Sequence, residues 1–246
     1  MRVGLFGRGR LGGAIASAAG GNLAWQVARE APPTGTVDVA VEASSGAAVP
    51  MRLQWALATH TPLVIGSTGW DPTGLDAATA GRIPVVLAPN FSLTVALLRR
   101  LAVVFGRFAA EDTQRDPYLI EHHHARKLDA PSGTARLLAE ALVAACPWKS
   151  GWAVGGPLGP EQLSVGVVRA GTTYSSHTVG IDSPDEVLEL THTSRSAGAY
   201  AAGALAAARF AVQCHARGRS GIITFDEVAA AALDPLFRGL AGEVTG

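Results

Sequence analysis

Short apolar runs alternate with helical patterns through the first 90 residues. Runs typical of strands, each five to eight residues long and ending near a turn residue, lie at 2–6, 23–28, 37–44, 62–69 and 83–90. Helical patterns occupy 11–20 and 48–60, between successive runs. Because strands separated by helices favour parallel pairing, this part of the chain predicts a doubly wound parallel sheet of the α/β class.

The pattern changes after Asn90. Helical stretches are expected at 92–106 (ending at Gly106), 132–146 and 198–214, and strands at 117–124, 163–170, 174–182 and 185–193. A glycine- and proline-rich segment at 147–162 is typical of a mobile loop. Thr224 and Glu227 have capping-box spacing and open a final helix. Consecutive strands without helices between them predict a second, α+β domain, with a mixed, largely antiparallel sheet and closed by the helix at 198–214.

Composition narrows the class of protein. Hydrophobic residues make up 48% of the 246 and charged residues 16%, which is typical of a globular chain. Lys plus Arg and Asp plus Glu are both 20, so we expect neither nucleic acid nor an anionic membrane as a partner. The two cysteines form no metal or disulfide pattern. Arginines interrupt the N-terminal apolar run, and no apolar stretch is long enough to span a membrane, so a cytoplasmic enzyme is expected.

A glycine motif directly follows the first predicted strand. Gly7, Gly9 and Gly12 form G-x-G-x-x-G before the first helix, which is the dinucleotide-binding arrangement of a Rossmann-like domain. The helix N-terminus offers unpaired N–H groups to phosphates, and Arg8 and Arg10 add positive charge. The alternative is a glycine-rich turn without a ligand, since the chain has 29 glycines.

The end of the second strand bears on the choice of cofactor. Glu30 at this place would bind ribose hydroxyls and favour NAD, whereas Arg29 would pair with a 2′-phosphate and favour NADP. A solvated strand end without a ligand is the third possibility. The sequence therefore leaves NADH and NADPH both open.

Three consecutive histidines, 122–124, raise the question of a metal site. Adjacent strand residues point to opposite faces and no cysteine or aspartate lies at ligand spacing, so we expect no metal. The other possibility is that these histidines belong to a surface strand without a functional role. Downstream, Ser132, Gly133 and Thr134 would present hydroxyls and free N–H groups at a helix N-terminus, an anion receptor distinct from the one at Gly7. Lys127 would add charge or donate a proton there, and a histidine is the natural acid–base group.

These residues carry a family resemblance. The stretch "EHHHARKLDAPSGTA" (121–135) resembles the E-x-H-H-x-x-K-x-D-A-P-S-G-T pattern of the 4-hydroxy-tetrahydrodipicolinate reductases, also called dihydrodipicolinate reductases. Three further stretches, "PLVIGSTGW", "VVLAPNFSLTVALL" and "VVRAGTTYSSHTVGI", are similar to other segments of that family, and "ELTHTSRSAGAYAAGALAAARF" resembles the terminal helix of its substrate domain. The glycine loop is one residue shorter than the common form and has Leu11 at the methionine position.

The resemblance implies a fold, a reaction and a set of site residues. It implies a dinucleotide domain from both chain ends (1–91 and 215–246) and a central substrate and oligomerisation domain (92–214), usually in a homotetramer. It implies NADH- or NADPH-dependent reduction of a cyclic dicarboxylate in lysine and diaminopimelate synthesis. His123 and Lys127 would be catalytic, and His124, Ser132, Gly133 and Thr134 would bind the substrate carboxylates. The cofactor residues would be Gly7, Arg8, Gly9, Arg10, Leu11, Gly12, Arg29, Gly66, Ser67, Thr68, Ala88, Pro89, Asn90 and Phe91.

Two other functions compete with this reading. A related dehydrogenase acting on another cyclic imine or amino acid would keep the glycine loop and change the second anion receptor. A non-catalytic redox sensor would bind the dinucleotide without needing His123 and Lys127. The intact KLDAPSGT segment argues against the first, and the presence of His123 and Lys127 beside a second anion site argues against the second.

Overall fold

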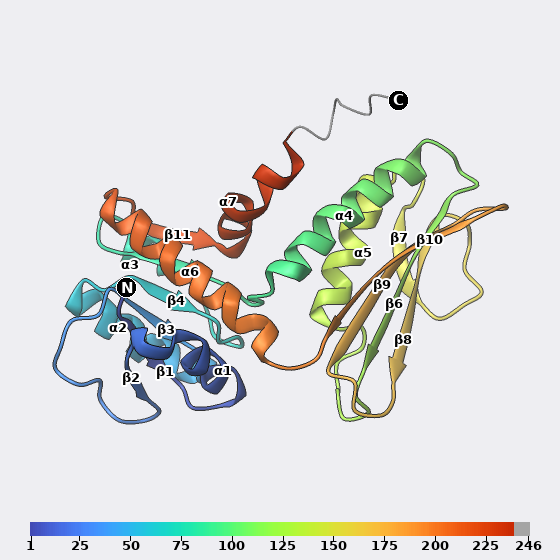
Figure 1. Ribbon diagram of the computed structural model, residues 1–246. Helices are drawn as coiled ribbons and strands as arrows, with labels where there is room; N and C mark the ends of the chain where they lie inside the picture. Colours follow the sequence, from blue (N-terminus) through green and yellow to red (C-terminus); the bar gives the residue numbers. More distant parts are fainter. Residues whose placement is uncertain (239–246) are drawn as a thin grey trace. The chain divides into compact units, whose positions relative to one another are not determined.

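The computed structural model describes residues 1–238, which form two compact units (Figure 1). Of the described residues, the first unit contains Met1–Leu93 and 197–238, and the second contains Thr94–Ser196. Among the described residues, no helix combines the length and the apolar character needed to cross a bilayer.

The first unit is built on a six-stranded sheet in the order β11-β5-β4-β3-β1-β2, and all of its pairings are parallel. Its strands are β1 (Val3–Phe6), β2 (Leu23–Val27), β3 (Val39–Glu42), β4 (Leu63–Ile65), β5 (Pro84–Leu87) and β11 (Gly221–Thr224). Its helices are α1 (Arg10–Ala19), α2 (Val49–Thr59), α3 (Leu75–Thr79), α6 (Gly198–Ala216) and α7 (Phe225–Phe237), with short 3₁₀ turns at Gly20–Asn22 and Gly46–Ala48.

Alternate residues of the parallel strands enter two separate cores. Val3, Leu5 and Val41 pack with α1, α6 and α7, whereas Phe6 and Ile65 pack with α2 and α3 on the other face. The sheet is therefore covered by helices on both faces, and the predicted doubly wound architecture is confirmed.

The second unit packs two helices on a five-stranded mixed sheet. The helices are α4 (Leu93–Ala110) and α5 (Gly133–Ala145). The strands are β6 (Asp116–His123), β7 (Gly151–Val154), β8 (Gln162–Arg169), β9 (Ser175–Asp182) and β10 (Val187–Ser194), in the order β10-β9-β6-β8-β7. The mixed sheet is confirmed, but β8 pairs parallel with both β6 and β7, so parallel pairing has a larger share than expected.

The alanine-rich helix α6 lies in the first unit, which differs from the expected boundary at 215. Its buried residues, Ala204, Ala207, Ala208 and Ala211 among them, share one core with the parallel sheet. A Cβ on Gly203 would lie 1.7 Å from the carbonyl O of Phe91, so the helix needs glycine to approach this closely. The sequence analysis assigned this helix to the second domain, and the structure differs because small residues allow a helix to pack closely on either sheet. Of the range 215–246, residues 239–246 lie outside the described part.

Three local expectations were wrong or incomplete. Helix α4 continues through Gly106, where a Cβ would lie 2.7 Å from the Cβ of Ala145, so this glycine permits close helix packing and does not end the helix. The segment 147–162 contains the strand β7, and buried Lys149 anchors it by donating from Nζ to the carbonyl oxygens of Pro160 (2.7 Å) and Gln162 (2.9 Å). The sequence analysis also missed the short strand β11. The capping box at Thr224 and Glu227 is present.

Candidate active site

Strand β6 separates the three histidines by its alternation. Glu121 and His123 share the buried face with Leu119, while His122 lies on the opposite face, where its Nε2 is 3.0 Å from the carbonyl O of Ala170. His124 follows the strand, and its Nδ1 is buried without a hydrogen-bond partner among the described residues. The triplet therefore does not converge on one point, as strand geometry requires.

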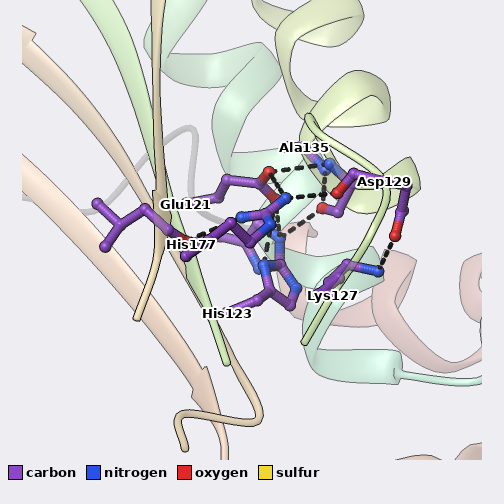
Figure 2. Close-up of polar contacts among 9 residues, drawn as sticks. Glu121, His123, Lys127, Asp129, Ala135 and His177 are labelled. Atoms are coloured by element: carbon purple, nitrogen blue, oxygen red, sulfur yellow. Dashed lines mark hydrogen bonds and ion pairs between the residues drawn. The ribbon is translucent and has the colours of Figure 1, made fainter. Parts of the chain in front are cut away.

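Glu121 lies at the centre of a buried polar cluster (Figure 2). Its Oε1 accepts hydrogen bonds from the backbone N–H of Ser132 (2.9 Å) and from Nη2 of Arg169 (2.6 Å). Its Oε2 lies 3.3 Å from Nδ1 of His123 and 3.7 Å from Nε2 of His177. One carboxylate thus joins strands β6, β8 and β9 to the start of helix α5.

Lys127 lies on the loop between β6 and α5. Its Nζ is 2.7 Å from Oδ1 of Asp129, and its side chain keeps 25% exposure. Its backbone N–H donates to the carbonyl O of His124 (3.1 Å), which fixes the turn that carries it. The hydrogen bond and charge of Lys127 hold the pKa of Asp129 below its ordinary value. The ammonium is accessible to a ligand whose carboxylate competes with Asp129.

The N-terminus of α5 is built by Ser132. Its Oγ accepts from the N–H of Ala135 (3.1 Å) and lies 3.2 Å from Nε2 of His177, so its polar groups are engaged within the protein. Gly133, the first helical residue, is exposed and has open space beside its Cα. Because the first N–H groups of a helix have no partner within the helix, an anion can approach at Gly133. Thr134 follows in the same turn.

Burial and hydrogen bonding set the charges of this cluster. Burial alone would raise the pKa of Glu121, but its contacts with His177, Ser132 and Arg169 outweigh burial and hold that pKa well below its usual range. Burial lowers the pKa of His123 to about 4, with His177, Lys127 and Arg169 acting in the same direction and Glu121 opposing them. At neutral pH the carboxylate is therefore ionised and the His123 imidazole is neutral.

The lowered pKa of His123 predicts loss of stability in mild acid. Below about pH 6.5 the unfolded chain binds a proton at this histidine, whereas the folded protein does not until about pH 4. The free energy of unfolding should therefore fall between pH 6.5 and 4 by roughly 2–3 kcal/mol from this residue. Denaturant unfolding of the wild type and His123→Asn across this range measures the effect. An equally steep fall in the variant would contradict the assignment.

The glycine loop has the geometry that a dinucleotide requires. Gly7 has φ +117°, and a Cβ there would lie 2.4 Å from the carbonyl O of Ala43. A Cβ on Gly12 would lie 2.3 Å from the carbonyl O of Gly7, so helix α1 packs directly on the turn. Gly9, the N-cap of α1, has nothing within 4 Å of its Cβ position. The open face at Gly9 fits a pyrophosphate on the helix N-terminus.

A cavity of about 440 Å³ opens beside this loop. It is lined by Gly7, Arg8, Gly9, Ala28, Arg29, Ser44, Ser45, Ala47, Ala48, Met51 and Arg52. Arg8 lies 3.5 Å from Oε1 of Glu30, whose other carboxylate oxygen accepts from the N–H of Ala28 (2.6 Å). Four of the predicted cofactor residues, Gly7, Arg8, Gly9 and Arg29, thus line one cavity, which has the volume and the positive charge for part of a dinucleotide.

The other predicted cofactor residues do not line this cavity. Phe91 is buried over Gly66, where a Cβ would lie 2.3 Å from its ring. Ala88 is buried, and Asn90 accepts at Oδ1 from the N–H of Ser92 (2.8 Å). Thr68 and Pro89 are exposed. Arg10, Leu11 and Gly12 lie in the first turn of α1, just behind the loop. Their predicted roles remain predictions.

The sequence analysis missed a buried charged pair next to the cavity. Glu42 accepts at Oε1 from the backbone N–H of Ser44 (2.7 Å) and from Oγ of Ser67 (3.0 Å). Arg52 lies 4.0 Å from Oε2 of Glu42 and donates to the carbonyl O of Ala28 (2.7 Å). The pair ties the ends of β2, β3 and β4 together. A carboxylate closing the apolar run 37–44 was the available signal. His177 and Arg169 were also missed, although both lie in a stretch that carried the resemblance.

Comparison with known proteins decides the family. Residues 26–91 match the family model described as dihydrodipicolinate reductase, N-terminus, and residues 92–228 match the one described as dihydrodipicolinate reductase, C-terminus. The chain belongs to the dihydrodipicolinate reductase family. It is therefore an oxidoreductase of the reduction step in lysine and diaminopimelate biosynthesis.

Curated relatives agree with this placement. A protein named 4-hydroxy-tetrahydrodipicolinate reductase from Exiguobacterium sp. is 38% identical to this chain over 177 residues, which are 70% of each chain. A protein of the same name from Thiobacillus denitrificans is 40% identical over 169 residues, which are 64% of this chain and 61% of the relative. A third, from Magnetococcus marinus, is 36% identical and covers 72% of this chain and 68% of its own. The family match begins at residue 26, so the argument for the glycine loop comes from its own geometry.

Solved structures show the same fold. A dipicolinate-bound dihydrodipicolinate reductase from Paenisporosarcina sp. TG-14 matches with a TM-score of 0.67 and 19% identity, over 91% of this chain and 97% of that one. The DAP dehydrogenase of C. glutamicum, in complex with DAP, matches with a TM-score of 0.53 and 15% identity, over 98% and 99%. The architecture of a dinucleotide unit with a second α+β unit is thus shared between these reductases and dehydrogenases.

Proposed function

We propose that this chain reduces 4-hydroxy-tetrahydrodipicolinate, after loss of water, to tetrahydrodipicolinate, with His123 and Lys127 as its catalytic residues. One observation carries the proposal. A buried imidazole, an accessible ammonium and a helix N-terminus lie on β6, the following loop and α5, all within one stretch of 13 residues (121–133). A cyclic substrate with two carboxylates and an imine needs an acid, a cation and an anion receptor together.

Each group has a distinct part in this chemistry. The loop at Gly7 and Gly9 would hold a reduced nicotinamide dinucleotide, which would supply a hydride to the conjugated ring, and the negative charge of the reduction would build toward the ring nitrogen. Lys127 and the N-terminus of α5 at Gly133 and Thr134 hold the carboxylates and offset that charge. His123 delivers the proton that completes the reduction. His124 would contribute a contact to a carboxylate from the same loop. The hydroxyl of Ser132 shapes the receptor by capping α5.

The receptor at Lys127 and α5 predicts competition by a planar pyridine dicarboxylate. Dipicolinate carries two carboxylates on a ring of the substrate's size, so it should bind the same ammonium of Lys127 and the same N-terminus of α5. We expect it to raise KM for the substrate without lowering kcat in steady-state assays. The monomethyl ester of dipicolinate, which keeps the pyridine ring and loses one carboxylate charge, serves as the matched control and should bind more weakly. Inhibition of equal strength by the control would contradict a two-carboxylate receptor.

For the cofactor we propose that both NADH and NADPH are used. Arg29 lines the cavity beside the glycine loop, where its charge suits a 2′-phosphate. Glu30 is adjacent and exposed, and breaking its ion pair with Arg8 would free it for ribose hydroxyls. No metal is part of this proposal, because the hydride and the proton account for the whole reduction.

We further propose a cytoplasmic homotetramer that associates through the sheet of the second unit. The family resemblance suggests this assembly, and exposed apolar residues on one face of β6, β8 and β10 support it: Ile120 (40%), Val168 (42%) and Val187 (57%). Light scattering should give a mass near four times the 25.2 kDa chain. A monomer mass at micromolar concentration would contradict it.

A further inference from the structure

The two oxygens of the Glu121 carboxylate have different partners. Oε1 is saturated by two donors, the N–H of Ser132 and the guanidinium of Arg169. Oε2 faces only imidazoles, Nδ1 of His123 at 3.3 Å and Nε2 of His177 at 3.7 Å. All three of these side chains are buried, with exposures of 0%, 7% and 2%. Within the described part of the chain, neither Oε2 nor Nδ1 of His123 makes a hydrogen bond, so the 3.3 Å between them is a close electrostatic contact.

This arrangement fixes which nitrogen of His123 carries the proton. A neutral imidazole has one N–H and one lone pair, and a lone pair facing a carboxylate oxygen at 3.3 Å is repulsive. The negative charge of Glu121 therefore favours the tautomer of neutral His123 with its proton on Nδ1. Nε2 then has the lone pair, and it is the atom that takes up a proton and passes it on. His177 packs edge-on against this ring, with centroids 5.2 Å apart, and limits its rotation.

We propose that Glu121 is the positioning residue that holds His123 in its Nδ1–H tautomer and ties it to the N-terminus of α5. The inference rests on the proposed role of His123. Protonation at Nε2 gives an imidazolium whose charge Glu121 balances across Nδ1. Release of that proton to the reduced ring returns the same neutral tautomer, so the imidazole ends each cycle as it began. The charged or titratable groups around the ring are Glu121 on β6, His177 on β9, Arg169 on β8 and Lys127 on the loop.

The substitution Glu121→Gln tests this inference with little change in shape. The amide oxygen can still accept from Ser132 and Arg169, whereas the amide NH₂ now faces His123 as a donor. His123 must then present a lone pair at Nδ1 and carry its proton on Nε2, which is the wrong tautomer for proton uptake. We expect kcat to fall about 100-fold or more, by analogy with carboxylate–histidine pairs elsewhere. Loss of the balancing charge should also move the ionisation seen in the kcat–pH profile to lower pH.

The tautomer can be measured without turnover. Nitrogen chemical shifts of ¹⁵N-histidine-labelled protein, with His123→Asn to assign the signal, should report protonated Nδ1 in the wild type and protonated Nε2 in Glu121→Gln. Glu140→Gln, an exposed carboxylate on α5, is the matched control and should alter neither kcat nor the shifts. If Glu121 only held the fold, Glu121→Gln would lower Tm and leave tautomer and pH profile unchanged, which would overturn the inference.

A second experiment distinguishes the positioning role of Glu121 from the alternative that this cluster binds a metal ion. Glu121, His123 and His177 offer ligand atoms that all lie within 4.8 Å of one another, a carboxylate and two imidazoles of the kind that zinc accepts. Dialysis of the wild type against EDTA should leave kcat unchanged. Activity lost on dialysis and restored by Zn²⁺ would overturn the positioning role. A wild type inactive on the substrate would refute the proposed function, while the nitrogen shifts would still decide the contact between Glu121 and His123.

Discussion

Replacing Lys127 with alanine should lower kcat by about 100- to 10,000-fold while cofactor binding persists. The ammonium is accessible, and in the substrate-free protein it lies 2.7 Å from Asp129, which a substrate carboxylate would displace. Without it, the charge that builds on the ring during reduction loses its nearest cation. The cavity beside the glycine loop, where we propose that the cofactor binds, lies in the other unit and shares none of these residues, so NADPH affinity should stay within a factor of two or so.

The matched control for this variant is Arg126→Ala. It removes the same charge from the adjacent, exposed position on the same loop. Steady-state kinetics of both variants, with cofactor titrations followed by fluorescence, separate a specific role from a general loss of positive potential. Near-normal turnover by Lys127→Ala, or an equal loss in Arg126→Ala, would contradict the catalytic assignment.

Two glycines of the first loop should respond to alanine in opposite ways. At Gly12 the added Cβ would lie 2.3 Å from the carbonyl O of Gly7, so α1 must shift away from β1. Such overpacking should cost about 1–3 kcal/mol of unfolding free energy. At Gly9 the Cβ enters open space on a backbone with φ −71°, which alanine adopts readily, so the fold should be unaffected.

Cofactor affinity, in contrast to stability, should be sensitive to the substitution at Gly9. Its open face is where a pyrophosphate would approach, and a methyl group there should weaken NADPH binding roughly tenfold or more. Thermal unfolding and calorimetric titration of Gly9→Ala and Gly12→Ala measure the two effects. If Gly9→Ala bound the cofactor as tightly as the wild type, the loop would not be the phosphate site.

Hydrophobic patterning predicted most of the fold because each strand and helix repeats its own periodicity. The predictions from this pattern failed where a helix of small residues can pack against more than one element. Helix α6 is rich in alanine and glycine, and its assignment to the parallel sheet depends on the core that its buried alanines share with that sheet and on the close approach of Gly203 to Phe91. The prediction that Gly106 ends its helix failed for a similar reason, because this glycine permits close packing against Ala145 of another helix. The strand β11 is four residues long and follows a helix end, which left it too short to stand out.

In the candidate site, too, the sequence predicted some residues and missed others. Residues that are close in sequence, such as His123, Lys127 and Ser132, were predicted because one contiguous stretch contains them. Arg169 and His177 come from neighbouring strands, and only pairing of β6 with β8 and β9 brings them to Glu121. Glu121 itself was noted as a carboxylate before the histidines, but its buried position between two strands and a helix depends on tertiary structure.

The most direct test of the central claim is a coupled reduction assay. The product of the preceding synthase is supplied as substrate, and oxidation of NADH and of NADPH is followed by absorbance with the wild type, Lys127→Ala and Arg126→Ala. We expect substrate-dependent oxidation of both cofactors by the wild type and Arg126→Ala, and almost none by Lys127→Ala. Absence of oxidation with either cofactor in the wild type would contradict it.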